Sequence, residues 1–205
     1  AIFSLLQEAL FGQAINVDSE LSNHTLSNER DVFESWVSVY KEAQTQAIIG
    51  LLAPVVAKHS EIPEQIRLKW SALQKSFAIK YTQIAAGQNE ICRILQEACI
   101  PTAIMKGMAA AIYYPIPEYR LMGDVDLLVS PKNYKTAIEL LEANEYKLTE
   151  DQDSQYHTAF YKYNILYELY KSPAGVHRSE EGDTIAKYIL SGLEHIFADY
   201  LLLSP

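Results

Sequence analysis

Residues Ile104 to Val129 read IMKGMAAAIYYPIPEYRLMGDVDLLV, and this stretch decides how the rest of the chain is interpreted. It predicts a short strand ending at Lys106-Gly107, a helical turn, a proline-containing loop and a second strand that opens at Asp124. Alternate residues of a strand point to the same face, so Asp124 and Asp126 would project side by side, with Cα atoms roughly 6.5–7 Å apart. Carboxylates at that spacing repel each other unless a cation lies between them. Hard divalent cations, Mg²⁺ above all, are the expected occupants.

Outward from this stretch, apolar residues recur mainly at helical spacing before it and at strand spacing after it. Helices are predicted over residues 2–12, from about Glu29, over 44–57 with a kink at Pro54, and from Pro63 to about Ala98. The second half predicts strands at 102–105, 124–129, 146–149, 156–163 and 165–170, helices at 107–114, 131–144 and 183–198, and polar loops at 16–28, 150–154 and 171–182. This order predicts an α+β fold, with an N-terminal helical subdomain (residues 1–99) before a small mixed β-sheet core with flanking helices (residues 100–205).

The spaced motifs of the central stretch resemble the signature of nucleotidyltransferases that have a DNA-polymerase-beta-like core. Within that superfamily they look most like a bacterial family of uncharacterised nucleotidyltransferases. The motifs are Met105-Lys106-Gly107, Tyr113-Tyr114-Pro115, Arg120 and Gly123-Asp124-Val125-Asp126-Leu127-Leu128-Val129. The resemblance implies that residues 100–205 form a nucleotidyltransferase core, which uses two Mg²⁺ ions, or Mn²⁺ in their place, and a nucleoside triphosphate.

A two-metal site for phosphoryl transfer usually needs a third carboxylate, and Glu168 is the candidate. In the strand predicted at 165–170, the apolar side chains of Ile165, Tyr167 and Leu169 would face one side and Glu168 the other. The resembled family has an acidic residue in the matching strand, which implies that Glu168 is a metal ligand beside Asp124 and Asp126. Two alternatives to metal binding remain. Glu168 could be a solvent-facing residue on an edge strand, and Asp124 in Gly123-Asp124 could cap a turn. No role is assigned to Tyr170, where many relatives are expected to have His.

Lys106-Gly107 lies between a strand and a helix, where free N–H groups and a permissive glycine favour a phosphate group. The superfamily usually has Ser after this glycine; here Met108 removes that hydroxyl, and Lys106 would supply charge instead. Lys106 could also be an ordinary solvated lysine. Arg120 could clamp the triphosphate or pair with Asp126. The resemblance adds Gly123 and His157 to the predicted nucleotide-binding residues, although a strand-surface role for His157 is equally consistent with the sequence.

Composition narrows the classes of partner. The net charge of −9 and the pI near 5.0 argue against a large nucleic-acid surface, which needs clustered Lys and Arg. No apolar run is long enough to span a membrane. The five histidines, His24, His59, His157, His177 and His195, have no zinc-ligand spacing. Cys92 and Cys99, expected about 10.5 Å apart along one helix, are too distant for a disulfide and favour a cytoplasmic protein.

Three functions remain open from the sequence. The first is a metal-dependent nucleotidyltransferase that moves a nucleoside monophosphate, most simply from ATP, to an acceptor hydroxyl on a small molecule or a protein. The second is a protein of the same fold that binds a nucleotide or a partner without turnover. It rests on Met108 and on the end of the chain at Pro205, where members of the resembled family generally continue with more helices. The third is a protein-docking helical half with the acidic pair as mere surface. The acceptor and the oligomeric state are not predicted.

Overall fold

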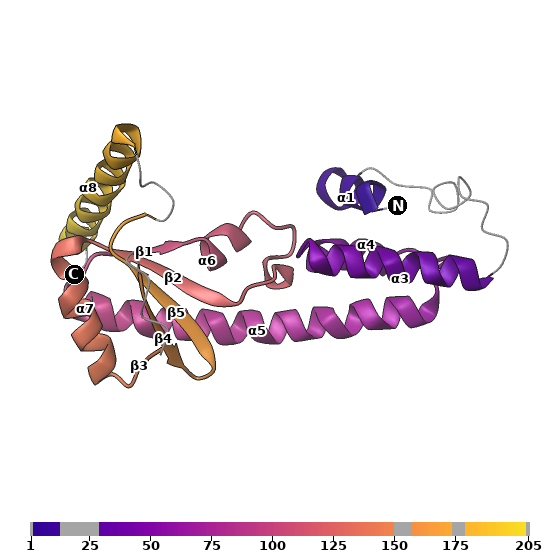
Figure 1. Ribbon diagram of the computed structural model, residues 1–205, viewed down its shortest axis with the longest axis horizontal. Helices are drawn as coiled ribbons and strands as arrows, with labels where there is room; N and C mark the ends of the chain where they lie inside the picture. Colours follow the sequence, from indigo (N-terminus) through magenta and orange to yellow (C-terminus); the bar gives the residue numbers. More distant parts are fainter. Residues whose placement is uncertain (1, 13–28, 150–156, 174–178, 204–205) are drawn as a thin grey trace. The chain divides into compact units, whose positions relative to one another are not determined.

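The computed structural model describes residues 2–12, 29–149, 157–173 and 179–203 (Figure 1). Two compact units make up the chain. The helical unit comprises Ala1–Thr82 and Ala111–Met122, and the sheet unit comprises Gln83–Ala110 and Gly123–Pro205. Helices thus precede one mixed sheet, which confirms the predicted α+β class. The division into subdomains at residues 99 and 100 stays a prediction.

The helical unit contains α1 (Ile2–Phe11), α3 (Glu29–Thr45), α4 (Ile49–Val56) and the first part of α5 (Glu64–Glu97). Its core is built around Trp36 and Trp70, each 1% exposed, and the ring of Tyr40 meets that of Trp70 edge-on at a centroid distance of 5.8 Å. These aromatic residues recur at helical spacing because they form one apolar stripe on each helix. Their packing accounts for the helical spacing of apolar residues in this half of the sequence.

Several predicted boundaries differ from the observed ones. Helix α4 begins at Ile49 instead of residue 44, because α3 continues to Thr45 and Ala47 has a left-handed backbone with φ of 56°. Cys99 lies beyond the end of α5, also with positive φ, so the two cysteines do not share a helix; both thiols are free. The loops predicted at 16–28 and 150–154 lie outside the described residues. None of the described helices is long and apolar enough to cross a membrane.

The loop before the acidic strand belongs to the helical unit because Gly50 lets it approach α4. A Cβ atom at Gly50 would lie 1.8 Å from the carbonyl oxygen of Tyr119, in the 3₁₀ helix η1 (Pro117–Tyr119). Only a residue without a side chain allows backbone to come that close to a helix. Gly50 therefore holds the proline-containing segment against α4.

The sheet unit carries five strands in the order β1-β2-β5-β4-β3. Strands β2 and β5 pair in parallel, and the other neighbours are antiparallel. The strands are β1 (Thr102–Met105), β2 (Asp124–Val129), β3 (Lys147–Leu148), β4 (His157–Lys162) and β5 (Ile165–Tyr170), and the unit's helices are the second part of α5, α6 (Gly107–Ala111), α7 (Pro131–Ala143) and α8 (Glu180–Leu203).

One face of this sheet is covered by α5 and α7. Gly87 of α5 lies directly under the hydroxyl of Tyr167, where a Cβ atom would be 2.1 Å from that oxygen. Lys162 of β4 pairs with Glu90 of α5 at 2.8 Å. From α7, the hydroxyl of Tyr134 lies 2.7 Å from that of Thr158. Because strand side chains alternate, Asp124, Asp126 and Glu168 must point to the opposite face.

A histidine between two carboxylates ties α1 to the turn before α5. His59 Nε2 lies 2.9 Å from Glu8 Oε2, and His59 Nδ1 lies 2.8 Å from Glu61 Oε1. Burial alone would lower the pKa of His59, but the hydrogen bonds and charges of the two glutamates outweigh it and raise the pKa above its usual value of 6.5. Both ring nitrogens can donate only when the ring is protonated.

We expect the stability of the helical unit to fall as pH rises through the raised pKa of His59. The stabilisation from the charged ring is fully present below pH 6.5, the ordinary value, and is lost above the folded-state value; about 1–2 kcal/mol is expected from charged hydrogen bonds. The free energy of unfolding in urea, measured from pH 5 to 9, tests this. His59→Gln should flatten the profile, and an unchanged profile would contradict the role of the cluster.

We expect Gly50→Ala to destabilise the helical unit by about 2 kcal/mol, because the new methyl group would overlap the Tyr119 carbonyl oxygen. Gly192→Ala in α8 is the matched control, since a Cβ atom there meets nothing within 4 Å. The free energy of unfolding of the control should rise by up to about 1 kcal/mol, because alanine has a higher helix propensity than glycine. Thermal unfolding measures both, and equal shifts in the two variants would refute the close approach.

Candidate metal centre

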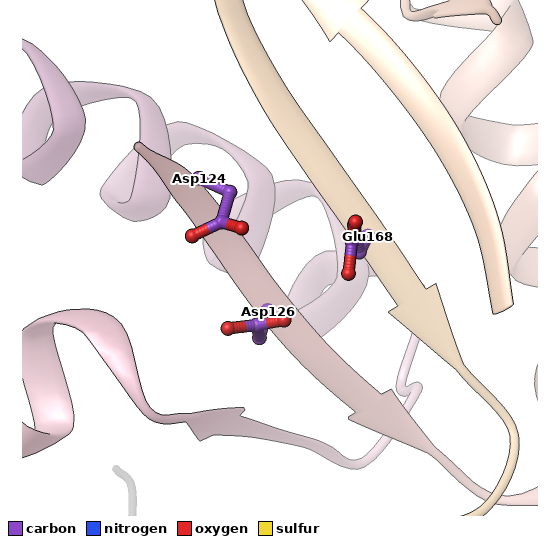
Figure 2. Close-up of side chains that lie close together, drawn as sticks. All are labelled: Asp124, Asp126 and Glu168. Atoms are coloured by element: carbon purple, nitrogen blue, oxygen red, sulfur yellow. The ribbon is translucent and has the colours of Figure 1, made fainter. Parts of the chain in front are cut away.

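Three carboxylates converge on the face of the sheet opposite α5 and α7. Asp124 and Asp126 lie two residues apart on β2, and the parallel register of β2 with β5 sets Asp126 opposite Glu168. One ligand oxygen from each of the three side chains lies within 4.8 Å of the others. Figure 2 shows the side chains projecting from the two strands to the same side. The geometry predicted for the aspartate pair and its convergence with Glu168 are both present.

The electrostatics of the cluster favour a cation. Asp126 is 2% exposed, and its pKa is raised, first by burial and further by the charge of Glu168. Lys106 opposes this rise but does not cancel it. A hard divalent cation prefers carboxylate oxygens and would stabilise all three ionised groups at once. Asp124, Asp126 and Glu168 could therefore hold a divalent metal ion, and the described residues contain no second group of this kind.

Lys106 reaches this cluster from the end of β1. Met105 pairs with Asp126 across the sheet, and the next two residues, Lys106 and Gly107, have φ of 48° and 40°. This left-handed turn brings Lys106 Nζ to 3.3 Å from Asp126 Oδ1, although the lysine side chain stays 58% exposed. Lys106 is thus an ion-pair partner of the buried aspartate that remains accessible from solvent.

The need for glycine at position 107 comes from the backbone. A Cβ atom there would make only ordinary contact, 3.7 Å from the Asp124 carbonyl oxygen, whereas a φ of 40° disfavours other residues. The helix that follows, α6, is only five residues long. Its dipole is correspondingly small, so Lys106 is the main source of positive charge at this turn.

Glu168 is held by two aromatic neighbours. The hydroxyl of Tyr170 donates a hydrogen bond to Glu168 Oε2, and His157 Nε2 lies 3.8 Å from Glu168 Oε1. Burial, followed by the hydrogen bond and charge of Glu168, raises the pKa of Tyr170, which therefore keeps its proton and can donate it. No role was predicted for Tyr170 from the sequence. Its position two residues after Glu168, on the same strand face, was the available signal.

The remaining predicted residues, Arg120, Gly123 and His157, differ in what they contact. Arg120 belongs to the Ala111–Met122 segment of the helical unit, and its Nη1 donates to the Leu121 carbonyl oxygen at 3.5 Å. Gly123 is exposed, and a Cβ atom there would meet nothing within 4 Å. His157 reaches Glu168 from the neighbouring strand β4. Nucleotide contacts by Lys106, Gly107, Arg120, Gly123 and His157 stay predictions.

Comparison with known proteins gives one match. The model of a family described as uncharacterised nucleotidyltransferase matches residues 34–191, a range that includes every residue of the acidic cluster. The chain matched none of the curated proteins and none of the solved structures with which it was compared.

We expect Tyr170→Phe to weaken Mn²⁺ binding about tenfold, because the variant removes the donor that orients the Glu168 carboxylate. Titration calorimetry with Mn²⁺ measures the change. Tyr188→Phe, at an exposed position of α8, is the control and should bind as the parent protein does. Equal affinities for the parent protein and Tyr170→Phe would show that this hydrogen bond does not support the metal site.

Proposed function

The chain belongs to the uncharacterised nucleotidyltransferase family, and from that premise we propose that it is a metal-dependent nucleotidyltransferase. The reaction moves a nucleoside monophosphate from a nucleoside triphosphate to an acceptor hydroxyl and releases pyrophosphate. The convergence of Asp124, Asp126 and Glu168 within 4.8 Å is the observation that carries the proposal. It supports the DNA-polymerase-beta-like mechanism that the motif around Gly123 implies.

The donor set fits Mg²⁺, with Mn²⁺ as a substitute. All three groups are carboxylates, which hard cations prefer, and phosphate oxygens would complete the shell of the ion. Asp124 and Asp126 would hold two ions, and Glu168 would complete the shell of the second. Such ions supply positive charge where negative charge develops on the attacking and leaving oxygens.

The residues of the chain would divide the remaining work. Lys106 would attract the β- and γ-phosphates, with the backbone at Gly107 and the side chains of Arg120 and His157 as further contacts. Glu168 would accept the proton of the acceptor hydroxyl. The acceptor oxygen then forms a bond to the α-phosphorus, while the bond from that phosphorus to the bridging oxygen breaks and its electron pair leaves with pyrophosphate. We take ATP as the first nucleotide to test and the cytoplasm as the location.

The second candidate function is that of a protein that binds a nucleotide without turning it over. Met108 stands where the superfamily usually has Ser, and Lys106 is already paired with Asp126, so two phosphate contacts are weakened. Calorimetry with ATP and Mn²⁺, beside an assay for pyrophosphate, separates the two candidates. Binding without pyrophosphate release would favour this second function.

We expect Asp126→Asn to abolish Mg²⁺-dependent transfer, because the variant removes a ligand charge while keeping the shape of the side chain. It should also abolish the rise in melting temperature that Mn²⁺ gives the parent protein, since ligand binding stabilises the folded state. Pyrophosphate release and thermal unfolding measure the two effects.

Glu139→Gln, at an exposed position on α7, is the control for the charge change and should keep both properties. Transfer that survives Asp126→Asn would overturn the assignment of the cluster as the catalytic centre.

A further inference from the structure

A hollow of about 630 Å³ lies beside Glu168 in the sheet unit. It is lined by strands β3, β4 and β5, and its wall includes Leu148, His157, Ala159, Tyr161, Leu166 and Glu168. Ala159 stands directly opposite Glu168 in the β4–β5 register, and Tyr161 stands opposite Leu166. Cross-strand partners share a face, so the hollow opens on the face that carries the carboxylates.

The strand order places this hollow and Lys106 on opposite sides of the carboxylates. Lys106 ends β1, the aspartates lie on β2, Glu168 lies on β5, and the hollow continues over β4 to Lys147 on β3. Neighbouring strands are about 4.8 Å apart, so the three groups follow one another in a line across the sheet. Figure 2 shows the middle of this line, where β2 and β5 present their acidic side chains together.

The geometry of phosphoryl transfer indicates which substrate the hollow could bind. In an in-line displacement the attacking oxygen and the leaving oxygen lie on opposite sides of the phosphorus. If the leaving pyrophosphate is held on the Lys106 side, the attacking hydroxyl must come from the other side, past Glu168. We propose that this hollow binds the acceptor of the reaction, an inference that rests on the proposed function.

The lining identifies the class of acceptor. The volume lies within the range of about 300–1,000 Å³ usual for small-molecule sites. Tyr161 and Leu166 offer aromatic and apolar surface to a ring or hydrocarbon body, and Glu168 receives the reacting hydroxyl. Lys147 at the rim attracts a negative group. The acceptor is therefore a small hydroxylated molecule with an apolar or cyclic body and an anionic substituent.

Two substitutions test the hollow without replacing a carboxylate. Ala159→Phe places a ring into the space opposite Glu168, and Tyr161→Asp puts a negative charge at a wall position that is 48% exposed. Tyr188→Asp, at a position of α8 that is 79% exposed, is the matched control for the second change. Binding of Mn²⁺ with α,β-methylene-ATP, followed by calorimetry, verifies that each variant keeps its metal and nucleotide sites.

The assay follows label from the α-phosphate of ATP into a cell extract that dialysis has separated into a diffusate and a retained macromolecular fraction. The parent protein and Tyr188→Asp should label the diffusate, and Ala159→Phe and Tyr161→Asp should lower that labelling about 100-fold while binding the nucleotide normally. Should Ala159→Phe misfold, Tyr161→Asp decides the result.

Three other results of the labelling assay would each overturn either the acceptor site, its small-molecule class or the proposed function. Undiminished labelling by both hollow variants removes the acceptor site and leaves the proposed function standing. Label found on protein or nucleic acid in the retained fraction refutes the small-molecule class. No labelling of either fraction by the parent protein removes the proposed function, and the acceptor site with it.

Discussion

The parallel pairing of β2 with β5 is the constraint on which the site depends. It sets Asp126 opposite Glu168, although 41 residues separate them in the chain, whereas a slip of one residue would turn one of the two carboxylates into the apolar face. The apolar partners on the other face, among them Leu127, Tyr167 and Leu169, are fully buried and hold that register. Packing on one face thus fixes the position of the charges on the other.

The charges oppose the fold that positions them. Three carboxylates within 4.8 Å repel one another, and Asp126 is almost completely removed from water. Lys106 and Tyr170 compensate in part, one through an ion pair and the other through a hydrogen bond to Glu168. Free energy spent on holding such a cluster together is typical of sites that bind a cation or perform chemistry.

The sequence was most informative where periodicity is local. Alternation on β2 predicted that Asp124 and Asp126 share a face, and the apolar alternation of β5 isolated Glu168. The sequence could not predict the features that depend on tertiary contacts. The partner found for Asp126 is Lys106, which depends on two left-handed residues at the end of β1, while the sequence suggested Arg120. Nothing in residues 111–122 indicated that Gly50, about 70 positions earlier, would hold them against α4.

The hydrogen bond from Tyr170 has a consequence for ion selectivity. It uses one lone pair of Glu168 Oε2, so binding of a cation by both oxygens of this carboxylate would compete with the hydrogen bond. Ca²⁺ needs six to eight ligands and commonly takes both oxygens of a carboxylate, whereas Mg²⁺ is satisfied by single oxygens in an octahedron completed by water or phosphate. A single tyrosine hydroxyl would thereby discriminate against the larger ion by reducing the number of oxygens available to it.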